Sequence, residues 1–146
     1  MHKQFLIVSA CLAVAVFSST CKLWPVNIIA VSNAAELGYA PQINNDRQVK
    51  ITATLQKIPK DAKTWEFELS LETHTHALSE GLEDSSVLIA AGKRYQPLGW
   101  EGSPPGGHHR KGILHFQAIT PNPVSVELQI RLIGDPAPRV FKWQLK

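Results

Sequence analysis

Residues 63–76 read KTWEFELSLETHTH, and the pattern of this stretch indicates the fold of the whole chain. Side chains alternate between the two faces of a β-strand, so residues two positions apart share a face. Trp65 and Phe67 then lie on one face, and Glu66 and Glu68 lie on the other. A strand with one apolar and one polar face covers a core on one side and meets solvent on the other.

The same kind of signal recurs along the chain, separated by turn residues. The stretch from residue 77 to 86 is expected to be a loop or a short helical turn, and Pro97 places its strand at a sheet edge. No amphipathic helix is expected. Strands are expected at residues 49–55, 63–76, 86–90, 94–100, 114–118, 124–132 and 141–145. About seven short strands predict an antiparallel immunoglobulin-like β-sandwich, with a partly open barrel as the alternative.

The first 34 residues have the parts of a secretory signal peptide. A basic start and an apolar run from Phe5 to Phe17 precede the small residues Ser32-Asn33-Ala34, where a signal peptidase can cut. We expect a signal peptide at 1–34, cleavage after Ala34, and a periplasmic or extracellular location.

Two other interpretations of the leader are disfavoured. Lys22 and Pro25 interrupt the apolar stretch that an uncleaved membrane anchor would need. A lipid anchor at Cys21 would need a leucine three positions earlier and a Gly, Ala or Ser directly before the cysteine, and Ser18-Ser19-Thr20 supplies neither. No membrane span is expected in the mature chain.

The mature chain is expected to consist of an N-terminal arm at 35–47, which has no periodicity, and a single β-sandwich domain at 48–146. Both cysteines, Cys11 and Cys21, lie in the leader. The domain therefore depends on its core or on a ligand for stability, because no disulfide can form in it.

The charge of the mature chain excludes one class of partner. The formal net charge of +3 falls by two when Lys3 and Lys22 leave with the leader. The pairs Lys93-Arg94 and Arg110-Lys111 are interpreted as solvated surface charges. No basic run interleaved with aromatic residues is present, so no nucleic-acid partner is expected.

The candidate site residues are four histidines. If the 63–76 strand stays extended to its end, His74 and His76 lie on its polar face about 6.5–7 Å apart along the strand. His108 and His109 follow a loop with two prolines and two glycines. Imidazole is a common ligand of Zn²⁺ and binds Cu²⁺ well, so these four histidines form a hypothetical copper or zinc site, with Glu72 or water in a further position.

Two alternatives stand beside the metal site. The histidines can instead hydrogen-bond unpaired loop carbonyls, so that His74 and His108 pin the loop to the strand end. The chain can also act as a structural interaction domain that presents the edge strand 94–100 to a protein partner.

Catalysis has little support in the sequence. Ser79 or Ser103 could be combined with a histidine and Asp84, but no spacing favours such a triad. We expect a binding or accessory module that is not an enzyme. A metal-dependent hydrolase is the alternative if the metal site keeps a free coordination position.

The histidine motifs also carry a resemblance. Leu71-Glu72-Thr73-His74 followed by Gly106-Gly107-His108-His109-Arg110-x-Gly112-x-Leu114-x-Phe116 resembles a family of uncharacterised secreted bacterial and archaeal proteins. The likeness covers residues 63–118, and Glu72 stands where that family commonly has Asp. The resemblance implies an exported β domain and transfers no catalytic residue to this chain.

Overall fold

The computed structural model describes residues 37–146. The expected signal peptide, its cleavage site and Cys21 lie outside the described residues. Within the described part, no helix is long and apolar enough to span a membrane. The elements are the 3-10 helix η2 (Leu37–Tyr39), β1 (Gln42–Asp46), β2 (Val49–Leu55), β3 (Thr64–Thr73), α1 (Leu82–Ser85), β4 (Ser86–Ala90), β5 (Lys93–Tyr95), β6 (Gly99–Gly102), β7 (His109–Gln117), β8 (Ser125–Ile130) and β9 (Arg139–Gln144).

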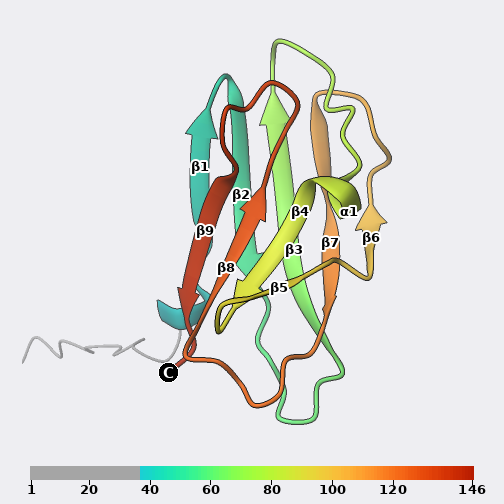
Figure 1. Cartoon of the computed structure of the whole chain (residues 1–146). Coiled ribbons are helices and arrows are strands. Elements are labelled where there is room, and N and C mark those ends of the chain that lie inside the picture. Colours follow the sequence, from blue (N-terminus) through green and yellow to red (C-terminus); the bar gives the residue numbers. More distant parts are fainter. Residues whose placement is uncertain (1–36) are drawn as a thin grey trace, which may run out of the picture. The chain divides into compact units, whose positions relative to one another are not determined.

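The strands form two antiparallel sheets, a five-stranded sheet in the order β1-β2-β3-β7-β6 and a four-stranded sheet in the order β5-β4-β8-β9 (Figure 1). Leaving β1 aside, β2-β3-β7-β6 corresponds to strands A-B-E-D of the immunoglobulin fold, and β4-β8-β9 corresponds to C-F-G. Strand β5 extends the second sheet next to β4, as C′ does. The predicted immunoglobulin-like β-sandwich is confirmed, with more strands than expected.

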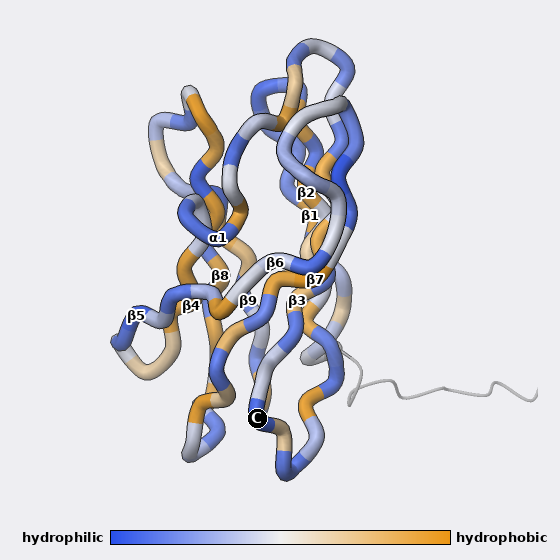
Figure 2. The backbone as a smooth tube through the Cα atoms, turned by 90° about the vertical axis from the view of Figure 1, so that its right-hand side faces the viewer, coloured by the Kyte–Doolittle hydropathy of each residue, from blue (hydrophilic) through white to orange (hydrophobic). Residues whose placement is uncertain are grey.

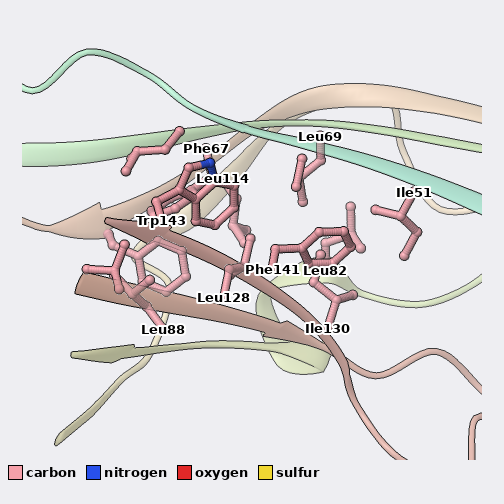
Figure 3. Packing of buried hydrophobic residues seen from close by; sticks show 14 of the residues in the cluster. Ile51, Phe67, Leu69, Leu82, Leu88, Leu114, Leu128, Ile130, Phe141 and Trp143 are labelled. Atoms are coloured by element: carbon pink, nitrogen blue, oxygen red, sulfur yellow. The ribbon is translucent and has the colours of Figure 1, made fainter. Parts of the chain in front are cut away.

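The core lies between the two sheets and consists mainly of the side chains that strand parity places inward, together with Leu78, Leu82, Ile119 and Leu132 from outside the strands (Figure 3). Phe67 joins two other aromatic residues of the core, with ring centroids 5.4 Å from Phe116 and 5.4 Å from Trp143 in edge-on contacts. Each buried aromatic side chain removes about 150–250 Å² from water. Figure 2 shows the underlying pattern, because hydrophobic and hydrophilic residues alternate along the tube of the strands. The core can therefore stabilise a domain without cysteines.

Residues 42–46 correct the interpretation of 35–47 as an irregular arm, since they form β1 and pair with β2. The side chain of Gln42 also reaches edge strand β9, where it donates to the Lys142 carbonyl and accepts from the Lys142 N–H. Trp143 Nε1–H donates to the Ala40 carbonyl at 3.1 Å. These contacts are hydrogen bonds of backbone and polar side-chain groups. They do not require apolar residues at alternate positions, so the sequence of this segment gave no strand signal. The segment closes one side of the sandwich.

Residues 94–100 also differ from the prediction of a single edge strand. Their first part belongs to β5 in the four-stranded sheet and their last part to β6 in the five-stranded sheet. The chain crosses between the sheets around Pro97, which has no N–H to donate to a ladder. Both strands are short, and Lys93 and Arg94 are exposed on β5. Short, charged edge strands resist pairing with another chain. Residues 94–100 therefore do not form the continuous edge strand that the protein-interaction hypothesis requires.

Two glycines face each other beneath the indole of Trp100. Gly102 on β6 is the register partner of Gly112 on β7. A methyl group added to Gly102 would lie 2.6 Å from the Gly112 Cα and 2.8 Å from Trp100 Cζ2. The pair therefore leaves room for the half-buried indole, whose Nε1–H donates to the Ser103 carbonyl at 2.9 Å.

We expect Gly112→Ala to lower the free energy of unfolding by about 1–3 kcal/mol, because the new methyl group would overlap backbone atoms that cannot move independently. Gly99→Ala is the matched control, since Gly99 is a glycine on the paired strand β6 and a methyl group there would meet nothing within 4 Å. Urea denaturation followed by fluorescence measures both. Equal losses for the two variants would contradict the packing account.

Candidate functional site at one end of the sandwich

The predicted histidines gather at one end of the sandwich, at the top of Figure 1. Register places Val49 beside Thr73 and Glu72 beside His109, so the start of β2, the end of β3 and the start of β7 lie together. In the second sheet, Ile130 at the end of β8 faces Arg139 at the start of β9. We call this the loop end, defined by the β1–β2 turn (47–48) and the β3–α1 (74–81), β6–β7 (103–108) and β8–β9 (131–138) loops.

The expected strand placement of His74 and His76 is wrong, because β3 ends at Thr73. The Thr73 hydroxyl lies 3.2 Å from the Thr75 hydroxyl and accepts a hydrogen bond from the Thr75 N–H at 3.4 Å. This local side-chain bond competes with the backbone hydrogen bonds that would continue the strand. The chain then bends, and His74, His76, His108 and His109 are all exposed. Strand parity therefore does not apply to the first two.

The structure brings two of the four histidines together. The ring centroids of His74 and His109 are 6.1 Å apart, with the rings edge to face. We call these two side chains the histidine pair. His76 instead hydrogen-bonds Thr75 Oγ1 through Nδ1 at 2.9 Å and lines a hollow of about 180 Å³ beside the β8–β9 loop. His108 is exposed and makes no side-chain hydrogen bond within the described residues.

No larger ligand set forms around the histidine pair. Among residues 37–146, no group of three or more His, Cys, Asp or Glu side chains is arranged to hold a metal ion. Glu72 is the register partner of His109, but its carboxylate binds Lys50 Nζ at 3.0 Å. That hydrogen bond and the Lys50 charge are the main reason that the pKa of Glu72 lies below its ordinary value. A metal at the histidine pair would therefore have two imidazole ligands from this chain.

The fifth histidine of the described residues lies elsewhere. His115 is half-buried on the outer face of β7, with Nε2 3.5 Å from Glu101 Oε2 and Nδ1 3.9 Å from Glu66 Oε1. The serines considered for catalysis bond to backbone, since Ser103 Oγ donates to the Lys111 carbonyl at 3.2 Å and Ser79 Oγ to the Ala77 carbonyl at 3.4 Å. Neither serine hydroxyl bonds a histidine in the described part of the chain.

Backbone groups, rather than imidazoles, hold the two histidine loops together. Thr73 N–H donates to the His108 carbonyl at 2.9 Å, and Leu78 N–H donates to the Gly107 carbonyl at 2.9 Å. Gly106 N–H returns a bond to the Leu78 carbonyl at 2.7 Å. Gly106 and Gly107 have φ angles of 112° and 71°, which glycine adopts without a steric cost. The ring nitrogens of His74, His108 and His109 bond no carbonyl within residues 37–146.

Arg110 is the side chain that sequence reasoning misjudged, because it is buried and not a solvated surface charge. Its Nη1 donates to the Glu80 carbonyl at 2.6 Å and the Leu78 carbonyl at 3.4 Å, and its Nη2 to the Ser103 carbonyl at 3.3 Å. The guanidinium carbon lies 5.7 Å from the centroid of the Trp100 ring. Burial lowers the pKa of Arg110, and the charge of Glu80 opposes that shift. Arg110 thereby joins the β3–α1 and β6–β7 loops.

A buried glutamate joins the third loop. Glu80 Oε1 accepts from the Ile133 N–H at 2.9 Å, which ties the β3–α1 loop to the β8–β9 loop. Its other oxygen, Oε2, is buried and has no hydrogen-bond partner among the described residues. The sequence placed Glu80 in a loop and offered no signal for its burial.

A buried ion pair fixes the β8–β9 loop against β1 and β2. Arg139 Nε donates to Asp135 Oδ2 at 2.9 Å and Nη2 donates to Oδ1 at 3.2 Å, so the pair is bidentate. Arg139 Nη1 also donates to the Val49 carbonyl at 2.7 Å and to Asn44 Oδ1 at 3.3 Å. Loops from both sheets are therefore held by two inward-facing arginines.

The ion pair makes stability depend on pH. Burial raises the pKa of Asp135, but the hydrogen bonds from Arg139 and the Leu132 N–H outweigh it, so that the pKa lies below the ordinary value. A lowered carboxyl pKa stabilises the fold above the unfolded pKa of about 3.9, and this contribution is lost as the pH falls through the folded value.

We expect the free energy of unfolding of the wild type to fall between about pH 5 and pH 2, and the slope in that window to be smaller in Asp135→Asn. Urea titrations at several pH values measure the slopes. Asp61→Asn, which changes an exposed aspartate, should keep the wild-type slope. An Asp135→Asn slope equal to the wild type would show that the pair does not set the acid response.

No protein-family model and no curated protein matches the sequence. The chain is similar in structure to MPT63, a secreted protein from Mycobacterium tuberculosis, with 17% sequence identity and a TM-score of 0.41; the match covers 74% of this chain and 93% of that one. The assignment of the fold rests on the strand order described above.

Proposed function

We propose that this protein is an exported binding module that contacts its ligand through the loop end and acts without catalysis. The observation that carries the proposal is the pair of buried arginines, because each ties loop backbone to another part of the fold. Burying a charge costs free energy that its partners must offset. Here the partners are mainly carbonyl groups at the loop end, so the network serves to fix loop conformation.

A fixed loop surface favours binding. Rigid loops lose less conformational entropy when a ligand binds, and loops positioned by a rigid scaffold commonly carry binding residues. The β3–α1 and β8–β9 loops occupy the places of the B–C and F–G loops of immunoglobulin domains, which bind antigen in variable domains. The exposed residues presented here include His74, His76, His108 and His109 together with Arg47.

The finer proposal is that the histidine pair binds Cu²⁺ or Zn²⁺. Two neutral imidazoles on neighbouring strand ends can coordinate one ion, with water or a partner group in the other positions. Stable zinc sites use three or four protein ligands, so the pair alone predicts weak, reversible binding. The contact between His74 and His109 supports this proposal and reduces the sequence-based set of four histidines to two.

The test is a titration of the exported, purified protein with Cu²⁺ and Zn²⁺, followed by calorimetry and by the imidazole signals in NMR spectra. We expect one equivalent to bind, and His74→Ala and His109→Ala each to remove most of the binding. His76→Ala is the matched control, because His76 is also exposed and lies outside the pair. Equal loss in the control, or no saturable binding by the wild type, would reject the metal proposal.

Export is tested on the same preparation. When the full chain is produced with its leader in a bacterium that secretes proteins, we expect mature protein outside the cytoplasm with Ala35 at its N-terminus. The intact mass and N-terminal sequence measure this directly. A mature protein that begins at a lipid-modified Cys21, or that keeps residues 1–34, would contradict the proposed leader.

A further inference from the structure

A second candidate site lies on the outer face of the four-stranded sheet, away from the histidine pair. It is a hollow of about 310 Å³, lined by Arg94 of β5, Val87 of β4 and Gln129 of β8 with their neighbours. Val87 and Gln129 are register partners across β4 and β8. On one side of the Val87–Gln129 pair, Arg94 is the register partner of Ile89. On the other side, the backbone N–H of Arg131 donates to the Ser85 carbonyl. The two arginines therefore stand at opposite corners of the hollow.

Both arginines lack an acidic partner. In the described chain, neither Arg94 nor Arg131 forms an ion pair, whereas Lys142 on the same sheet binds Glu127 at 3.0 Å. The side chain of Arg131 makes a single long hydrogen bond, 3.4 Å, to the Pro136 carbonyl. Asp84 is the one acidic residue that lines the hollow, which leaves an excess of positive charge there. The planar guanidinium group suits bidentate recognition of carboxylates.

The rest of the lining fits a small polar molecule. Val87 is buried, is the register partner of Gln129, and lines the hollow together with Gln96. The amide nitrogen of Gln129 donates to Glu127 at 2.6 Å, which leaves its oxygen as an acceptor. Ser85 also lines the hollow, and its buried hydroxyl has no partner within residues 37–146. The volume is at the lower end of the range for small-molecule pockets, about 300–1,000 Å³.

We propose that this hollow binds a small organic acid with two or more carboxylates and a hydroxyl group. Arg94 and Arg131 each bind one carboxylate, and Gln129 accepts from the ligand hydroxyl. The site shares Arg131 with the β8–β9 loop, but it uses neither the histidine pair nor a metal.

The test uses citrate and tartrate as probes and the exported, purified protein. Binding is followed by chemical shifts in NMR spectra at constant pH and ionic strength, with acetate and glycerol as probes that lack the second carboxylate. We expect saturable shifts at Val87, Gln96 and Gln129 with citrate or tartrate, and weaker binding by about tenfold or more in Arg94→Gln and in Arg131→Gln.

Arg47→Gln is the matched control, because Arg47 is an exposed arginine at the loop end and should bind the probes like the wild type. All three variants change exposed side chains, and their spectra report whether the fold is intact. Shifts that do not saturate, equal binding of acetate, or the same loss in Arg47→Gln as in Arg94→Gln would overturn the proposal.

Discussion

Replacement of Arg139 by methionine is expected to lower the free energy of unfolding by about 3–5 kcal/mol, the largest effect expected of any single change. The variant would leave the buried carboxylate of Asp135 without its bidentate partner. It would also leave the Val49 carbonyl without the Arg139 donor, and Asn44 would lose its link to β9. Small domains are stable by only about 5–15 kcal/mol, so the loss is a large fraction of the total.

Urea denaturation monitored by tryptophan fluorescence measures the effect of Arg139→Met, and Arg131→Met is the control. Arg131 lies in the β8–β9 loop that precedes Arg139, but it is exposed and forms no ion pair with a described residue. Surface substitutions of this kind usually change stability by about 0.5 kcal/mol or less. A loss below about 1 kcal/mol in Arg139→Met would show that the buried pair does not hold the β8–β9 loop.

Replacement of Arg110 by methionine has the second largest expected effect, a loss of about 2–4 kcal/mol. Methionine fills much of the space but donates nothing, so the carbonyls of Leu78, Glu80 and Ser103 would lose a donor. The charge of buried Glu80 would also lose the cation that faces it. An unsatisfied buried acceptor costs about 1–3 kcal/mol, and partial relaxation of the loops limits the sum.

The control for Arg110→Met is Lys111→Met at the next position of β7. Lys111 is exposed and binds Glu68 at 2.7 Å, and an exposed pair contributes about 0–1 kcal/mol. Amide hydrogen exchange gives a second readout, because Arg110→Met should increase exchange in the β3–α1 and β6–β7 loops before the strands open. Unchanged exchange in both loops would contradict the assigned role of Arg110.

The buried arginines illustrate what the sequence could have shown. Arg110 shares strand parity with Leu114 and Phe116, and Arg139 shares it with Phe141, all of which face the core. Strand parity alone therefore predicts that both arginine side chains face the core. The general preference of arginine for solvent pointed outward, and only the positions of loop carbonyls from distant segments decide between the two.

The histidines illustrate a different limit. Their residue type and clustering identified the loop end as the region of interest. The contact of His74 with His109 depends on the register of β3 with β7 and on the bend after Thr73. Register between strands is set by the whole sheet, so a local pattern could not separate this pair from His76 and His108.

The sequence by itself determined the class of fold and the apolar core positions of the strands, because alternation along a strand is a local property that a packed sandwich must satisfy. Tertiary structure alone decided the features that depend on distant segments. These are the polar strand β1, the division of residues 94–100 between two sheets, the burial of Arg110, Glu80 and the Arg139–Asp135 pair, and the histidine pair. Each depends on backbone groups or charges far apart in the chain, which no periodicity records.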